Sequence, residues 1–191
     1  MDWNSKTEVK KGNLGEAMVR DIFESNGWHI YPHASEGPHI IDMVMMRGAR
    51  ENSMDLMLLD VKTKAHRTYY SDTGLNLHHY YLYSKFSNEH NSNFYLAFVD
   101  ESEKKVYGNY KSELEKPRCI EKNGRTLKYP LIQNEIIYFP YPDAFEMLGD
   151  LTPGFCKQLK KLSQRNYEYP EYKATSGTNA KISTNGAGVV E

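Results

Sequence analysis

Two apolar runs separated by a short polar segment constrain the fold of this chain more than any other feature. The first run covers residues 40–46 and the second covers residues 56–64, and each has the length of a strand. Because both are rich in apolar residues, we expect strands that are covered on both faces. The segment between them, residues 47–53, contains glycine and small polar residues that suit a hairpin connection.

Each apolar run contains an aspartate, and a hairpin would bring the two together. If the turn is centred on Glu51, Asp42 lies directly opposite Asp60. Like charges in such a position are unfavourable, and burying them costs several kcal/mol unless a cation compensates. Strand alternation places Lys62 on the same face as Asp60. The pattern therefore predicts two carboxylates that bind a metal beside an ammonium group, which suits phosphodiester hydrolysis.

This constellation resembles the PD-(D/E)XK nuclease superfamily, which includes type II restriction endonucleases and archaeal Holliday-junction resolvases. The resemblance rests on Asp42, on Asp60-Val61-Lys62 in the next strand, and on Glu16 in a predicted N-terminal helix, and it covers about residues 11–110. Ile41 stands where the superfamily name has proline. The resemblance implies an α/β fold of the restriction-endonuclease type, in which helices flank a central mixed β-sheet.

The resemblance also implies roles for these residues. Asp42 and Asp60 would hold Mg²⁺ or Mn²⁺, Glu16 would complete or support the metal shell, and the Val61 main-chain carbonyl would be a further ligand. Lys62 would stabilise charge on the phosphate, so the catalytic set is Glu16, Asp42, Asp60 and Lys62. Taken singly, each has an ordinary explanation, such as a first-turn glutamate or a solvated strand end. Taken together, they favour the catalytic interpretation.

Other polar residues are candidates for contact with nucleic acid. Lys64 and Arg67 are expected to position phosphates, although an exposed strand end explains them equally well. His79 lies in a helix predicted over residues 75–88, and the resemblance suggests that a histidine of this helix faces the site. His33 and His39 are expected to be loop residues, because oxygen ligands suit Mg²⁺ better.

The periodicity elsewhere predicts the remaining elements. In the helix over 75–88, Leu77, Tyr80, Tyr81 and Ser84 share the expected packed face, and this helix supplies the crossover that parallel strands need. Residues 117–134 are expected to form a loop with a small excursion. The other expected elements are a helix over 14–26 capped by residues 11–13, strands over 28–31, 93–100, 105–110 and 134–139, and a helix over 155–162.

Length and composition bound the class of protein. The 191 residues suit a nuclease core over 1–110, an extension over 111–172 packed on it, and a disordered tail over 173–191. A net charge of −1 supplies no global basic field, so nucleic-acid binding must use local patches. Cys119 and Cys156 lack metal-binding spacing. Without a signal-peptide pattern or a membrane-spanning run, we expect a cytoplasmic protein with no membrane partner.

The sequence thus predicts a metal-dependent endonuclease that hydrolyses nucleic-acid phosphodiester bonds. DNA is the first candidate substrate, while RNA and homodimer formation are left open. One alternative is a non-catalytic nucleic-acid-binding or assembly protein that retains the nuclease fold. Another is a structural protein in which Asp60 and Lys62 form a solvated pair.

Overall fold

A computed structural model describes residues 6–32, 40–48, 54–67, 69–122 and 124–162 of the chain. In these ranges, none of the helices combines the length and the hydropathy that a bilayer span requires.

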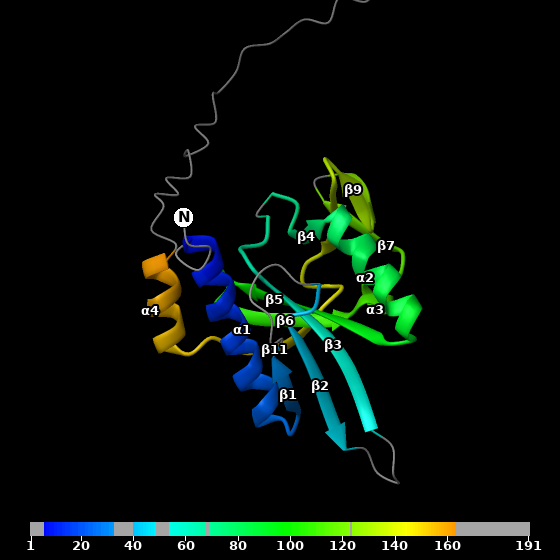
Figure 1. Cartoon of the computed structure of the whole chain (residues 1–191). Coiled ribbons are helices and arrows are strands. Elements are labelled where there is room, and N and C mark those ends of the chain that lie inside the picture. The colour runs from blue at the N-terminus through cyan, green and yellow to red at the C-terminus, as the bar shows by residue number, and fades with distance from the viewer. Residues whose placement is uncertain (1–5, 33–39, 49–53, 68, 123, 163–191) are drawn as a thin grey trace, which may run out of the picture.

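The centre of the fold is a mixed sheet of six strands in the order β1-β2-β3-β5-β6-β11 (Figure 1). Every neighbouring pair is antiparallel except β3 and β5. Helix α2 (Leu77–His90) lies in the connection between these two parallel strands, which confirms the predicted crossover. The strands are β1 (His29–Pro32), β2 (Met43–Gly48), β3 (Met54–Thr63), β5 (Asn93–Asp100), β6 (Lys105–Tyr110) and β11 (Glu146–Asp150).

Helices and a second sheet cover the two faces of the main sheet, so the predicted α/β architecture with flanking helices is confirmed (Figure 1). One face packs against α1 (Thr7–Ser25) and α4 (Pro153–Leu162). The other face packs against α2, the short helix α3 (Lys111–Leu114) and a sheet of three strands. The strands of that sheet, in spatial order, are β4 (Asp72–Asn76), β10 (Ile136–Pro140) and β9 (Leu131–Gln133). Strands β7 (Arg118–Lys122) and β8 (Arg125–Tyr129) form a separate hairpin.

Alternate residues of β3 enter two different cores. Leu59 and Val61 join the core beneath α1, whereas Leu58 joins the core beneath α2. Because side chains alternate along a strand, Asp60 and Lys62 point toward the α2 side. The central strand therefore fixes which face carries the acid and the lysine.

The hairpin register agrees with the prediction, although the strand bounds differ. Met43 lies opposite Leu59 and Val44 lies opposite Leu58, which is the symmetry that places Asp42 next to Asp60. Strand β2 begins after Asp42, so it covers later residues than the predicted 40–46. Residues 49–53 of the predicted turn lie outside the described residues.

The first helix is longer than predicted. It begins at Thr7, and residues 11–13 lie inside it, so the predicted cap at these positions is wrong. Glu8, Lys10 and Lys11 are good helix formers, and they outweigh the cost of a single glycine at position 12. The predicted stop is confirmed, because Gly27 has a φ of 80° and the helix ends at Ser25.

The second helix begins two residues later than predicted. Residues 72–76 form β4, and Asn76 then caps α2 by accepting a hydrogen bond from the His78 main-chain N–H at 2.8 Å. The predicted packed face is wrong at Tyr81, which is 58% exposed, and Tyr83 is the buried ring instead. Pairing of Leu75 with the remote Ile137 sets this boundary, and no local pattern reports it.

The chain after residue 111 contains more strands than predicted. The loop expected over 117–134 is wrong, because this region forms β7, β8 and β9. The strand expected over 134–139 is β10, the helix expected over 155–162 is α4, and β11 has no counterpart among the predictions. Strands β5 and β6 have the predicted bounds, and β1 is shifted by one residue. The predicted tail over 173–191, like His33 and His39, lies outside the described residues.

Candidate functional site

Asp42 sits immediately before β2 and is held by the main chain of β3. Its own N–H donates to the Leu59 carbonyl at 3.0 Å, and its carboxylate Oδ2 accepts the Val61 N–H at 2.6 Å. Because β2 starts only at Met43, the Val61 N–H has no main-chain partner on the β2 side. The Asp42 carboxylate accepts this N–H in place of a main-chain carbonyl, and the bond fixes the carboxylate beside the end of β3.

Asp60 and Lys62 form a buried ion pair on the α2 side of β3. The side chain of Asp60 is 3% exposed, and that of Lys62 is 27% exposed. Lys62 Nζ donates to Asp60 Oδ1 at 2.9 Å and lies 2.7 Å from Oδ2, outside hydrogen-bond geometry for that atom. Both Asp60 oxygens therefore lie against the Lys62 ammonium group, and Oδ2 makes this ion contact without a hydrogen bond.

Three acidic groups perturb one another at this point. Burial, with help from the Glu16 charge, raises the pKa of Asp42 to about 6. Burial also raises the pKa of Asp60 to about 6, with Asp42 adding to the effect and Lys62 opposing it. The pKa of Glu16 is raised by burial and then by Asp60. The mutual effects place all three carboxyl groups and the lysine within electrostatic reach of one another.

Glu16 reaches this group because α1 approaches β3 very closely. A Cβ atom on Gly15 would lie only 1.8 Å from Thr63 Oγ1, so no larger residue fits between the helix and the strand as they stand. Glu16 follows directly and is partly buried. The structure thus brings together all four residues of the predicted catalytic set, while their catalytic roles stay predictions.

Helix α2 adds two residues beside the acid pair. Tyr83 is 2% exposed, and burial together with the charge of Asp60 and a hydrogen bond to it raises the pKa of this phenol far above its ordinary value. The phenol therefore keeps its proton beside Asp60 and can donate it in a hydrogen bond. His79 lies one turn earlier, and its pKa is lowered by burial and by Lys62. The sequence pattern predicted His79 as a site residue and did not indicate Tyr83. Tyr83 lies one helical turn after His79, and this spacing places both side chains on the same face of α2.

Lys64 and Arg67, predicted to contact phosphates, have different surroundings. Burial, with help from the Lys62 charge, lowers the pKa of Lys64 to about 8, so the side chain is still mostly cationic at neutral pH. Arg67 binds Asp72 through Nε at 2.5 Å and Nη2 at 2.6 Å, and its guanidinium lies 3.6 Å from the Tyr138 ring centroid. Asp72 is completely buried, so Arg67 neutralises it. Contact with phosphate stays a prediction for both cations.

The donor atoms at the hairpin end suit a hard divalent cation. Among the described residues, no group of three or more His, Cys, Asp and Glu side chains is arranged to hold a metal. Mg²⁺, however, is usually bound by one or two carboxylates and keeps several waters. Asp42 and Asp60 supply that number, and the Lys62 ammonium group already shows that Asp60 faces a cation. The residues therefore fit the ion that the superfamily resemblance implies.

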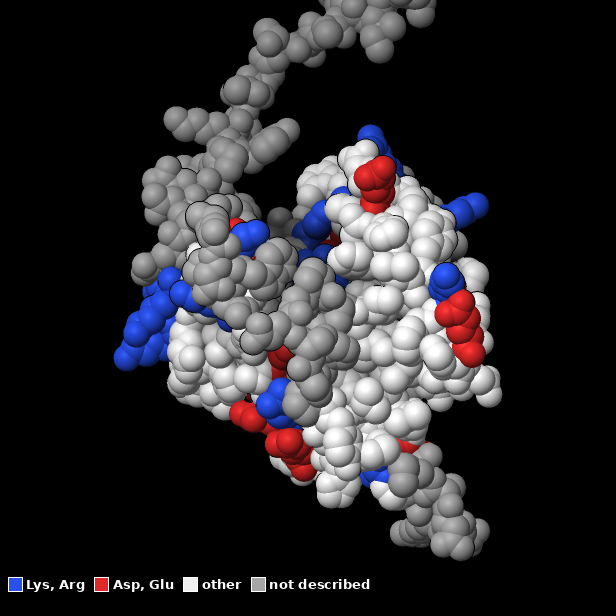
Figure 2. Space-filling view, viewed as in Figure 1, with Lys and Arg blue, Asp and Glu red and all other residues white. Residues whose placement is uncertain are grey.

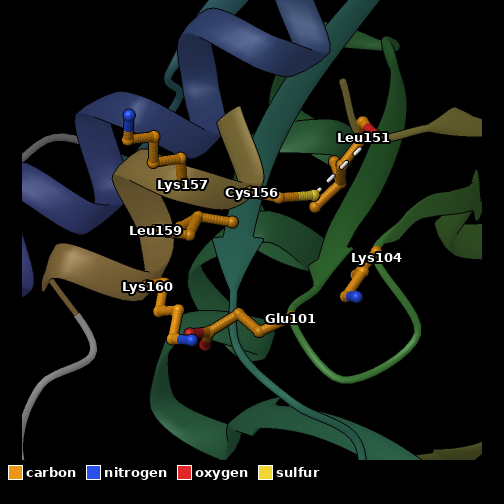
Figure 3. A pocket seen from close by; sticks show the side chains of 7 residues that line it. All are labelled: Glu101, Lys104, Leu151, Cys156, Lys157, Leu159 and Lys160. Atoms are coloured by element: carbon orange, nitrogen blue, oxygen red, sulfur yellow. Dashed lines mark hydrogen bonds between the residues drawn. The ribbon is translucent and has the colours of Figure 1, made fainter. Parts of the chain in front are cut away.

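A separate pocket of about 460 Å³ lies between α4 and the turn that joins β5 to β6 (Figure 3). Leu151, Cys156 and Leu159 form its apolar part, and the Cys156 thiol donates to the Leu151 carbonyl. None of the predicted site residues lines it. The acid pair and this pocket are therefore different features of the molecule.

Comparison with known proteins finds likenesses among solved structures alone. No protein-family model and no curated protein matches the chain. Among solved structures, it is similar to Hjc, a Holliday junction resolvase of Archaeoglobus fulgidus, with a TM-score of 0.42 and 13% identity. The match covers 74% of this chain and 96% of that chain.

Proposed function

We propose that this protein is a metal-dependent nuclease that hydrolyses phosphodiester bonds in nucleic acid, with DNA as the first candidate substrate. The observation that carries the proposal is the meeting of Asp42, Asp60 and Lys62 in a buried position at the end of a hairpin. Two buried acids with raised pKa values lower the stability of the fold and bring it no benefit by themselves. Such a pair is what a site for a cation and an anionic substrate requires.

In this proposal, Asp42 and Asp60 hold Mg²⁺ or Mn²⁺. The Val61 carbonyl is a third candidate ligand, because the N–H and C=O of one strand residue point to the same side and the Val61 N–H binds Asp42. When bound, the ion polarises the phosphate and lowers the pKa of a coordinated water. The Val61 N–H keeps the Asp42 carboxylate oriented, and Tyr83 does the same for Asp60.

Lys62 and Glu16 have complementary tasks in the hydrolysis. The Lys62 ammonium group can turn from Asp60 toward a phosphate oxygen and stabilise the charge that grows there as water attacks phosphorus in line. Glu16, whose pKa is raised by burial, can orient that water and hold its proton. The leaving oxygen then takes a proton from solvent.

Cleavage of labelled DNA in Mg²⁺ and in EDTA tests the proposal. Duplex, branched and single-stranded DNA are incubated with wild-type protein, Asp60→Asn and Lys62→Ala. We expect cleavage only with the metal, and a loss of about 100-fold or more in each variant. Matched controls are Asp55→Asn and Lys85→Ala, whose side chains are 51% and 71% exposed. These two should cut at the wild-type rate.

Two results would remove the proposal. Cleavage by a folded Asp60→Asn/Lys62→Ala double variant at the wild-type rate would take both residues out of the reaction. Tight, Mg²⁺-dependent DNA binding without cleavage of any of the three substrates would favour the non-catalytic nucleic-acid-binding alternative.

A further inference from the structure

A second pocket, which we call the tyrosine pocket, lies between the segment after β3 and the β7–β8 hairpin. Its volume is about 150 Å³, and the described residues that line it include no acidic side chain. It is lined by Tyr69, Tyr70, Lys122, Arg125 and Leu127. Among these residues, two aromatic rings and one aliphatic side chain meet two cations, and none of the roles proposed above uses them.

The apolar side of the tyrosine pocket suits a planar ring. Tyr69 is 64% exposed, and its ring meets that of Tyr70 edge to face, with centroids 4.7 Å apart at 84°. This edge-to-face contact leaves at least one flat face of the Tyr69 ring uncovered by Tyr70. An exposed tyrosine face is a stacking surface for a nucleobase, and Leu127 extends the apolar wall.

The polar side of the tyrosine pocket suits phosphate. Lys122 Nζ donates to Ser71 Oγ at 2.8 Å, which holds the ammonium group beside the two tyrosines. Arg125 is exposed on β8 and faces the same pocket. Guanidinium and ammonium groups are the side chains that bind phosphate. A planar base joined to phosphate describes a nucleotide.

The tyrosine pocket lies on the same side of the main sheet as Lys62. Tyr69 follows Lys62 by seven residues in the sequence, which limits their separation to about 25 Å. Arg67 connects the two regions, because it binds Asp72 of β4 and its guanidinium lies 4.7 Å from the Tyr70 ring centroid. Figure 2 shows Lys and Arg atoms gathered in a hollow near the position of β4. One nucleic-acid strand can therefore span both places.

We propose that the tyrosine pocket binds one unpaired nucleotide of a nucleic-acid strand, with the base on Tyr69 and the phosphates on Lys122 and Arg125. A base inside a duplex has both faces stacked and cannot present one to the ring. The pocket therefore selects nucleic acid that carries a bulged, flipped or single-stranded nucleotide. Its position relative to the cut bond rests on the proposed nuclease function, whereas nucleotide binding itself does not.

The test is a binding measurement in EDTA, so that cleavage plays no part. Fluorescence anisotropy of labelled DNA is recorded for a perfect duplex, for the same duplex with one bulged base, and for a single strand. We expect wild-type protein to prefer the last two, and Tyr69→Ala to weaken these two by about 5- to 100-fold. Tyr69→Phe keeps the ring and should bind as wild type does. Arg125→Ala should weaken binding and reduce its salt dependence.

Matched control variants separate the pocket from general charge and folding effects. Lys128→Ala removes a cation from the opposite side of β8, and Tyr81→Ala removes an exposed tyrosine from α2. Both should keep the preference for unpaired bases. Because Tyr69 is largely exposed, Tyr69→Ala should fold, and circular dichroism checks this.

The outcomes keep this inference separate from the proposed function. Loss of the preference in Tyr69→Ala supports the pocket, whether or not the wild-type protein cuts DNA. Equal binding of all three DNAs by wild type, no binding at all, or equal losses in Tyr69→Ala and Lys128→Ala would overturn it. A free nucleoside monophosphate could displace the labelled DNA at a concentration as low as that of the DNA itself. This result would show that the pocket binds a free nucleotide, and it would overturn the assignment to a nucleic-acid strand.

Discussion

Asp42 and Asp60 lie where an apolar pair would make a more stable hairpin. Burial raises the pKa of both carboxyl groups, and the Glu16 charge adds to this effect at Asp42 as the Asp42 charge does at Asp60. A stability cost concentrated in a few polar side chains is common where a site must bind a charged ligand. The cost also makes the pair accessible to measurement without any substrate.

We predict that Asp42→Asn stabilises the metal-free protein at alkaline pH. An asparagine oxygen can still accept the Val61 N–H, but it brings no charge into the buried site. Because the folded-state pKa of Asp42 is raised to about 6, the folded wild type holds more protons than the unfolded chain between about pH 4 and pH 6. Wild-type stability therefore falls as pH rises through this window and stays lower above it.

Urea unfolding in EDTA measures the difference. Asp42→Asn should be about 1–3 kcal/mol more stable than wild type near pH 8, and the difference should vanish below about pH 4. Asp55→Asn, on the exposed part of β3, should show no such pH dependence. A constant difference at every pH would mean that Asp42 is not a buried, strained carboxylate.

At the residue scale, the sequence predicted the acid pair but not its supports. A symmetric hairpin fixes which residues face each other, so Asp42 and Asp60 follow from the turn position alone. The hydrogen bond from the Val61 N–H to the Asp42 carboxylate depends on β2 beginning at Met43, just after Asp42. The contact of Tyr83 with Asp60 depends on the rotation of α2 about its axis. Both are set by packing between distant segments, and no local pattern encodes them.

At the scale of elements, the contact between α1 and β3 positions Glu16. Gly15 lets the helix backbone approach Thr63 more closely than any side chain would allow. Gly12 lies one turn earlier in the same helix, and nothing lies within 4 Å of the place its Cβ would occupy. The two glycines therefore share a helix and differ in what they face.

We predict opposite effects of alanine at these two positions. Gly15→Ala should destabilise the protein by about 1–3 kcal/mol, because the helix or Thr63 must move. Gly12→Ala should stabilise it by about 0.5–1 kcal/mol through helix propensity. Thermal unfolding monitored by circular dichroism measures both.

The Thr63 side chain provides a check on the cause. Gly15→Ala combined with Thr63→Ala should recover most of the loss, since the second change removes the Oγ1 atom that the new Cβ would meet. That hydroxyl is buried without a hydrogen-bond partner, so its removal breaks no hydrogen bond and adds little cost in stability. Additive losses in the double variant would show that the contact is not the cause.

The predicted and missed elements differ in how locally they are encoded. Strand β5 is buried along almost its whole length, so its apolar run is unambiguous. Strands β4 and β11 are short, and their partners lie far along the chain, as in the pairing of Leu75 with Ile137. Strands β7 and β8 expose about every second residue, so they resemble a polar loop in sequence. Pairing with a neighbouring strand, rather than intrinsic propensity, makes these segments strands.

At the scale of the whole molecule, charge is balanced overall and uneven locally. The net charge is −1, yet Lys157, Lys160 and Lys161 cluster on α4 along one edge of the molecule (Figure 2). The acids of the hairpin end lie deep between the helices of the two faces. With no global positive field, binding of an anionic strand must rely on local cations and on a bound metal that offsets the acids.

We predict that Mg²⁺ stabilises the whole fold in a pH-dependent way. A ligand that binds only the folded state stabilises it by RT ln(1 + L/Kd), where L is the free ligand concentration, and binding to Asp42 and Asp60 requires both carboxylates to be ionised. Because their pKa values are raised to about 6, protons compete with the metal at acidic pH. If the dissociation constant is about 1 mM, about 10 mM Mg²⁺ near pH 8 should raise the melting temperature by about 3–6 °C.

Differential scanning calorimetry at two pH values separates site binding from a general salt effect. The rise should disappear near pH 5, where the acids hold protons, and it should be absent at both pH values in Asp60→Asn. Asp55→Asn should behave as wild type does, because its exposed carboxylate lies away from the hairpin end. An equal rise in Asp60→Asn, or no rise in wild type near pH 8, would separate the buried acids from metal binding. The metal would then bind elsewhere on the molecule, and Asp42 and Asp60 would not hold the cation that the proposed hydrolysis requires.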